Sequence, residues 1–105
     1  MSKIRRSKYG NVKTNGFDSK REYMRYRDLL LMEKAGMISH LQTQVRFEIV
    51  PKTDRFRGVH YIADFVYLDK NGDRVVEDSK GKKTALFIVK QKLMYHVLGI
   101  EVICV

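Results

Sequence analysis

Two carboxylates and one lysine stand where they could act together on a phosphodiester. Asp64 lies in an alternating stretch, so it shares a strand face with the apolar side chains of Ile62 and Val66. Asp78 and Lys80, two residues apart in the next alternating stretch, share one face as well. The Asn-Gly signature between the two stretches predicts a hairpin. Pairing in that hairpin would bring Asp64 and Asp78 together across the ladder, with Lys80 just beyond.

The chemistry of such a group is hydrolytic. Converging carboxylates repel one another unless a cation lies between them, and hard oxygen ligands favour Mg²⁺ or Mn²⁺. A lysine in the same pocket can steady an attacking water or a phosphate oxygen while the metal polarises the phosphorus centre. Plainer interpretations stay open at this point. Asp64 could be the buried partner of a basic side chain, and Asp78 and Lys80 could be exposed hairpin charges.

The elements that must position these residues follow the order α-β-β-β-α-β. A helix begins after Ser19, which has capping-box spacing to Glu22, and ends at Ala35-Gly36. A mixed sheet of about four strands with flanking helices, in a single α/β domain, is therefore expected. The strands are predicted over residues 38–50, 60–68, 74–80 and 100–105, and the second helix from its cap at 84 to 98.

Three segments resemble a known nuclease superfamily. Ile62-Ala63-Asp64-Phe65 and, after the hairpin, Val76-Glu77-Asp78-Ser79-Lys80-Gly81 look like the motifs of PD-(D/E)xK nucleases. The segment Phe17-Asp18-Ser19-Lys20-Arg21-Glu22 resembles the leading helix of that superfamily. Together they resemble small phage-encoded proteins placed in it as endonucleases, and the likeness covers nearly all of the chain after about residue 8. It implies a restriction-endonuclease-like fold and similarity to Holliday junction resolvases.

The resemblance also implies roles for individual residues. Asp64 matches the first motif aspartate, Asp78 the second acidic position, Lys80 the motif lysine and Glu22 the acid of the leading helix. Asp64, Asp78 and Glu22 would then hold Mg²⁺ or Mn²⁺, and Lys80 would complete the catalytic set. Glu22 has an alternative role as a helix cap. Glu77 is expected to point to the opposite face and to lie outside the site.

Charge points to a partner rich in phosphate. Lys and Arg number 21 against 12 Asp and Glu, a net charge of +9. Residues 1–16 are basic with almost nothing to bury, so they are predicted to form an N-terminal arm, and residues 17–105 the nuclease-like domain. The side chains expected to contact DNA are Lys3, Arg5, Arg6, Lys8, Lys13, Lys20, Lys82 and Lys83.

Length and composition exclude several classes. A chain of 105 residues builds one core and leaves no room for a two-domain cofactor enzyme. The longest apolar run is five residues, 85–89, so no membrane partner is expected. The first residues hold no apolar signal core, which predicts a cytoplasmic protein, in the host cytoplasm if it is phage-encoded. The single Cys104 allows no internal disulfide.

These inferences predict a Mg²⁺-dependent (or Mn²⁺-dependent) DNA endonuclease. Selectivity for branched DNA and assembly as a homodimer are further expectations. The alternative is a non-catalytic basic nucleic-acid-binding module on the same fold. A third hypothesis is a structural protein of a phage particle or an inhibitor of another protein.

Overall fold

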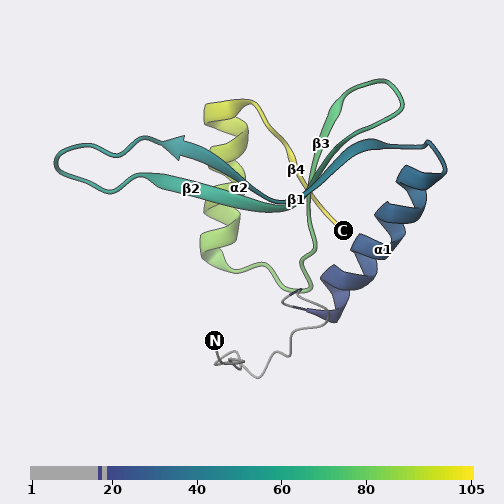
Figure 1. Cartoon of the computed structure of the whole chain (residues 1–105). Coiled ribbons are helices and arrows are strands. Elements are labelled where there is room, and N and C mark those ends of the chain that lie inside the picture. The colour runs from purple at the N-terminus through teal and green to yellow at the C-terminus, as the bar shows by residue number, and fades with distance from the viewer. Residues whose placement is uncertain (1–16, 18) are drawn as a thin grey trace, which may run out of the picture.

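The computed structural model describes residue 17 and residues 19–105 (Figure 1). The predicted order α-β-β-β-α-β is confirmed. The elements are α1 (Lys20–Lys34), β1 (Ser39–Val50), β2 (Val59–Leu68), β3 (Arg74–Asp78), α2 (Ala85–Leu98) and β4 (Val102–Cys104). The strands form one sheet in the order β1-β2-β3-β4, in which β1, β2 and β3 pair antiparallel and β3 pairs parallel with β4. The predicted mixed α/β class is therefore confirmed.

Both helices begin and end at the predicted capping residues. The Ser19 hydroxyl accepts from the Glu22 amide at 3.0 Å, and the Thr84 hydroxyl accepts from the Phe87 amide at 3.1 Å. Gly99, with φ of +69°, closes α2 in the left-handed conformation that glycine adopts without strain. Neither helix in the described part of the chain is long and apolar enough to cross a membrane.

The hairpin between β2 and β3 fixes the register at the site. Asp69 organises its five-residue turn, because its Oδ1 accepts from the amides of Asn71 and Asp73. Phe65 then pairs with Glu77, so that one step further along the ladder Asp64 lies beside Asp78. The third strand was expected to continue to residue 80, but it ends at Asp78.

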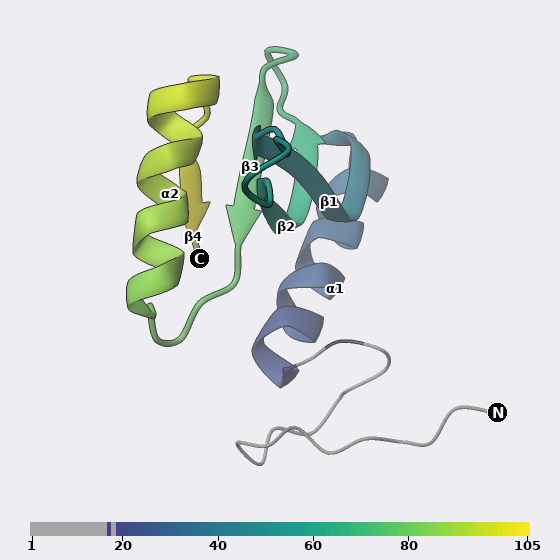
Figure 2. The ribbon, with the colours of Figure 1, turned by 90° about the vertical axis from the view of Figure 1, so that its left-hand side faces the viewer.

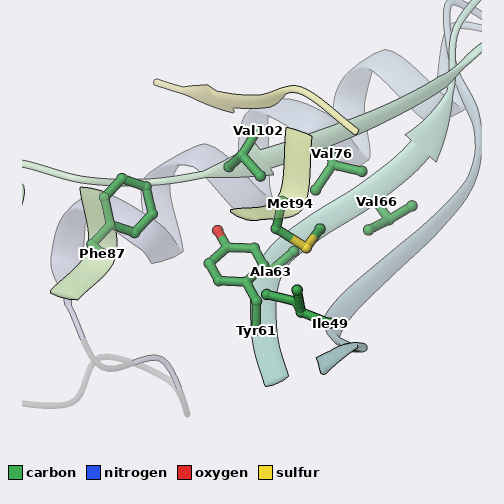
Figure 3. Close-up of a cluster of buried hydrophobic side chains, with 8 residues drawn as sticks. All are labelled: Ile49, Tyr61, Ala63, Val66, Val76, Phe87, Met94 and Val102. Atoms are coloured by element: carbon green, nitrogen blue, oxygen red, sulfur yellow. The ribbon is translucent and has the colours of Figure 1, made fainter. Parts of the chain in front are cut away.

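The helices lie on opposite faces of the sheet (Figure 2), and each covers its own apolar cluster. On the α1 side, Leu29 and Ile38 pack with Phe65 and Tyr67. On the α2 side, Phe87 and Met94 of the helix pack on the sheet (Figure 3). The buried members of the α2-side cluster are Ile49, Tyr61, Ala63, Val66, Val76, Phe87, Met94 and Val102.

The alternation of side chains in β2 between the two faces of the sheet shifts at Asp64. Ala63 belongs to the α2-side cluster, whereas Phe65, two residues on, belongs to the α1-side cluster. The expected single apolar row around Asp64 is therefore wrong in part, since Ile62 is 45% exposed while Val66 is buried. The paired strand is irregular at the same level, since Gln44, opposite Asp64, has a φ of +54°.

Candidate active site

The structure brings Asp64, Asp78 and Lys80 together where β2 meets the end of β3. Asp64 Oδ2 accepts from the Ser79 amide at 2.8 Å. Because the Ser79 amide donates to a side chain, it does not continue the strand ladder, and β3 ends at Asp78. Asp78 is buried, the Tyr61 hydroxyl donates to its Oδ2, and Lys80 Nζ lies 3.4 Å from its Oδ1. The convergence inferred from strand alternation is thus found in the structure.

Glu22 and Gln44 extend the group on the side of α1. Glu22 enters from the first turn of α1 and is buried. Gln44 Nε2 donates to Glu22 Oε2 at 2.9 Å and lies 3.5 Å from Asp64 Oδ1, so one amide bridges the two carboxylates. The Ser19 half of the predicted capping box is formed by the Glu22 backbone amide, which leaves the Glu22 carboxylate directed to Gln44.

Gln44 is the site residue that reasoning from the sequence did not select. Its signal is its place in the ladder, because Thr43 pairs with Phe65 and Val45 pairs with Ala63, which sets Gln44 opposite Asp64. Its backbone occupies the left-handed region with φ of +54°, a conformation uncommon for a residue other than glycine. That backbone conformation aims the amide at the carboxylates.

The surroundings of Asp64 disfavour its charged form. Burial raises the pKa of Asp64 to about 7, and the nearby charges of Asp78 and Glu22 act in the same direction. The hydrogen bond from the Ser79 amide acts against this rise in pKa, but it is outweighed. A carboxylate in such a position gains more than an ordinary one from a cation held beside it.

The donors present suit a hard divalent cation. Mg²⁺ and Mn²⁺ prefer carboxylate oxygens, which Asp64, Asp78 and Glu22 supply. Asp78 Oδ1 is buried and accepts no hydrogen bond among the described residues, and the Lys80 ammonium lies 3.4 Å from it. Within residues 17 and 19–105 no three His, Cys, Asp or Glu side chains already form a ready-made metal centre. The fit therefore rests on donor chemistry and on that buried oxygen.

Lys80 stands at the wall of an open groove beside the carboxylates. Its Nζ lies 5.0 Å from the centroid of the Phe87 ring, which holds the ammonium against α2. The groove has a volume of about 250 Å³, and Asp64, Asp78 and Lys90 also line it. A larger hollow of about 440 Å³ lies elsewhere on α2, and Glu101 is the one carboxylate among the residues that line it. Asp64, Asp78 and Lys80 therefore share the smaller groove.

Glu77 lies on the opposite face of β3, as expected. Its Oε1 and Oε2 accept from the Arg25 guanidinium at 2.9 and 2.7 Å, and the Tyr67 hydroxyl donates to it as well. The hydrogen bond to Glu77 raises the pKa of Arg25. Glu77 thus belongs to a structural ion pair.

The residues expected to bind DNA fall into two groups. Lys20, Lys82 and Lys83 are exposed, the first at the start of α1 and the other two between β3 and α2. Neither the structure nor its contacts test their role. The predicted contacts of the arm, at Lys3, Arg5, Arg6, Lys8 and Lys13, lie outside the described residues.

The fold and the site define a small mixed α/β domain with a carboxylate and lysine cluster at the edge of a groove. The chain belongs to the DUF1064 family, described as a protein of unknown function, whose profile matches residues 1–101. No curated protein and no solved structure matches the chain.

Proposed function

We propose that this protein is a divalent-metal-dependent DNA endonuclease with a site of the PD-(D/E)xK kind and a restriction-endonuclease-like fold. The observation that carries the proposal is the convergence of Asp64, Asp78 and Lys80 beside the groove. Glu22, joined to Asp64 through the Gln44 amide, adds a third carboxylate from a separate element. The similarity of the three sequence segments to small phage-encoded nucleases supports the same assignment.

In this proposal each side chain has a distinct task. Asp64, Asp78 and Glu22 hold Mg²⁺ or Mn²⁺. When bound, the ion polarises the phosphodiester and eases departure of the leaving oxygen. Lys80, held between Asp78 and the Phe87 ring, faces the groove and stabilises negative charge on the attacking water or on a phosphate oxygen. Water adds to phosphorus and one P–O bond breaks, which leaves a phosphate monoester and a hydroxyl.

DNA is the substrate that the charge favours. Lys80 and Lys90 line the groove, and the whole chain carries a net charge of +9. Selectivity for branched DNA and a homodimer remain predictions, which competition between four-way junctions and linear duplex, with light scattering, would test.

The proposal is tested by cleavage of linear and four-way-junction DNA in Mg²⁺, Mn²⁺ or EDTA. We expect cleavage with either metal and none in EDTA. Asp64→Asn, Asp78→Asn and Lys80→Ala should each lower the rate by about 100-fold or more, because each removes a charge at the reacting group. Lys92→Ala, an exposed lysine of α2 outside the groove, is the matched control and should cleave normally.

Melting temperatures of all variants separate lost chemistry from lost folding. Cleavage that persists in EDTA would exclude the metal. Full rates in the three site variants, with unchanged melting, would exclude the assigned residues. DNA binding without cleavage under every condition would favour the non-catalytic nucleic-acid-binding module.

A further inference from the structure

The connection between β1 and β2, residues 51–58, forms the tip of a long hairpin that extends past α2 (Figure 1). Sequence patterns mark this segment only as a polar connection. We refer to residues 51–58 as the hairpin tip. Its side chains combine an exposed aromatic ring with positive charge: Lys52, Arg55 and Arg57 are exposed around Phe56, and Asp54 is the one acidic residue.

Phe56 is 73% exposed, more than any other large hydrophobic side chain in the described part of the chain. It stands alone, since no second aromatic residue occurs in the tip. A single exposed ring whose neighbours in the sequence are two exposed arginines offers a planar face and two cations but little apolar area. This combination suits a nucleobase flanked by phosphates better than an apolar protein groove.

Hydrogen bonds around Thr53 close the backbone turn that presents Phe56. The Thr53 hydroxyl accepts from the amides of Arg55 at 3.2 Å and Phe56 at 2.9 Å. The Thr53 amide donates to the Phe56 carbonyl at 2.9 Å, which closes the turn. At the base of the tip, a Cβ on Gly58 would lie 2.6 Å from the Val50 carbonyl oxygen, so only glycine fits there. The turn thus holds the ring out into solvent.

We propose that the hairpin tip binds nucleic acid by stacking Phe56 on an unpaired base while Arg55 and Arg57 contact the neighbouring phosphates. Every base has a π face, so such stacking tolerates any sequence, and the arginines add contacts that depend on salt. The ligand class is therefore DNA with unpaired bases, such as a single strand or an open branch point.

The position of the tip agrees with this role. Strand β2 runs directly from the tip to Asp64, and His60 and Ile62 on the way line the groove. At a rise of about 3.3 Å per residue, the six residues 59–64 span roughly 20 Å. A nucleic acid strand in the groove can therefore reach the tip. The inference goes beyond the proposed function, because it concerns binding alone and holds with or without hydrolysis.

A fluorescence experiment tests the proposal directly, because the chain contains no tryptophan. Phe56→Trp places a single reporter at the tip, and Leu31→Trp, at a residue 66% exposed on α1, is the matched control. Each full-length variant is titrated with single-stranded oligothymidine in EDTA, so that cleavage plays no part. We expect quenching by stacked bases in Phe56→Trp and none in Leu31→Trp.

Affinity measurements identify what the ring recognises. Phe56→Ala should weaken binding to the single strand by about tenfold, with a change of about twofold or less on blunt linear duplex. Phe56→Tyr, which keeps a stacking ring, should bind normally. Arg55→Ala and Arg57→Ala should each reduce the steepness of the salt dependence, by about 0.7 in the log-log slope on single strands.

Clear outcomes would overturn the proposal. Unchanged Phe56→Trp fluorescence at saturating oligonucleotide would show that bound DNA does not touch the tip. Equal loss of affinity for duplex and single strand in Phe56→Ala would exclude recognition of unpaired bases. Absence of all DNA binding by a folded protein would leave the tip to a protein partner. Because no cleavage is measured, none of these outcomes decides whether Asp64, Asp78 and Lys80 hydrolyse DNA.

Discussion

Two neighbouring acids of β3, Glu77 and Asp78, are equally buried and have opposite surroundings. Both are 2% exposed, and they point to opposite faces of the sheet. Glu77 receives both arms of the Arg25 guanidinium and the Tyr67 hydroxyl, so its charge is balanced. Asp78 has the Tyr61 hydroxyl and a single ammonium 3.4 Å away. Burial of an acid alone therefore does not identify a reactive site here.

The balance of charge around the two acids separates a structural pair from a candidate site. On the α1 face, one carboxylate meets one guanidinium in bidentate geometry, which is the arrangement that stabilises a buried pair. Around Asp78, burial raises the pKa of Asp64, and the charges of Asp78 and Glu22 act in the same direction. An excess of negative charge is costly in a buried position unless a cation is recruited. The contrast gives Glu77 the surroundings of a structural ion pair and agrees with the proposed catalytic role of Asp78.

The largest effect should come from breaking the balanced pair. Glu77→Ala leaves the Arg25 guanidinium and the Tyr67 hydroxyl without their shared acceptor. We expect the free energy of unfolding to fall by about 3 kcal/mol. This value is at the lower end of the range for a broken buried ion pair, because the Arg25 side chain is 27% exposed. Asp78→Asn, which still accepts from Tyr61, should change stability by less than about 1 kcal/mol. Urea unfolding of both variants measures the difference.

Glu77→Gln provides the control for this comparison, because it keeps acceptor atoms but removes the charge. It should fall between the wild type and Glu77→Ala. Wild-type stability in Glu77→Ala, or a larger loss in Asp78→Asn, would contradict the assignment of the two faces.

Local signals in the sequence account for much of the fold. The hydroxyls of Ser19 and Thr84 begin the helices, and Gly99 ends the second one, because caps depend on a few neighbouring residues. The alternation around Asp64 and Asp78, with one turn between them, was enough to predict that they meet. Such features can be predicted from the alternation within one strand and from the turn next to it.

Features that depend on a second segment could not be predicted from the sequence. The expected extension of β3 failed because the Ser79 amide bonds to Asp64, 15 residues away. No local sequence pattern predicts the left-handed backbone at Gln44. The change of face in β2 could not be predicted either. The exposure of Phe56 also depends on a turn whose hydrogen bonds are specified by Thr53 rather than by periodicity.

The second prediction tests whether Glu22 belongs with Asp64 and Asp78 in the proposed metal site. Glu22→Gln keeps the cap, since Ser19 accepts from the backbone amide, and a glutamine oxygen can still accept from Gln44. Stability should therefore change by less than about 1 kcal/mol. If Glu22 holds the metal, the Mg²⁺ concentration for half-maximal cleavage should rise by about tenfold or more.

Glu33→Gln is the matched control for that variant. Glu33 lies on the same helix and also accepts a hydrogen bond, from the Leu41 amide at 3.0 Å, yet it belongs to neither face of the comparison. It should leave the Mg²⁺ dependence unchanged. An identical Mg²⁺ titration for Glu22→Gln and the wild type would reduce Glu22 to a residue that orients Gln44.

The last prediction concerns the pH dependence of stability that Asp64 produces. The pKa of Asp64 in the folded protein is about 7, above the ordinary value of 3.8 that applies in the unfolded chain. Between these two values the folded state holds a proton that the unfolded state has released. Stability from Asp64 is therefore complete below about pH 4 and is lost as the pH rises through 7.

Asp64→Asn cannot ionise, so it should gain stability relative to the wild type over the same range. Melting temperatures of both proteins in EDTA at pH 5, 6, 7 and 8 measure this difference in stability. A difference that stays flat across the range would show that neither burial nor the nearby carboxylates raise the pKa of Asp64, and the contrast between Glu77 and Asp78 would lose its electrostatic basis.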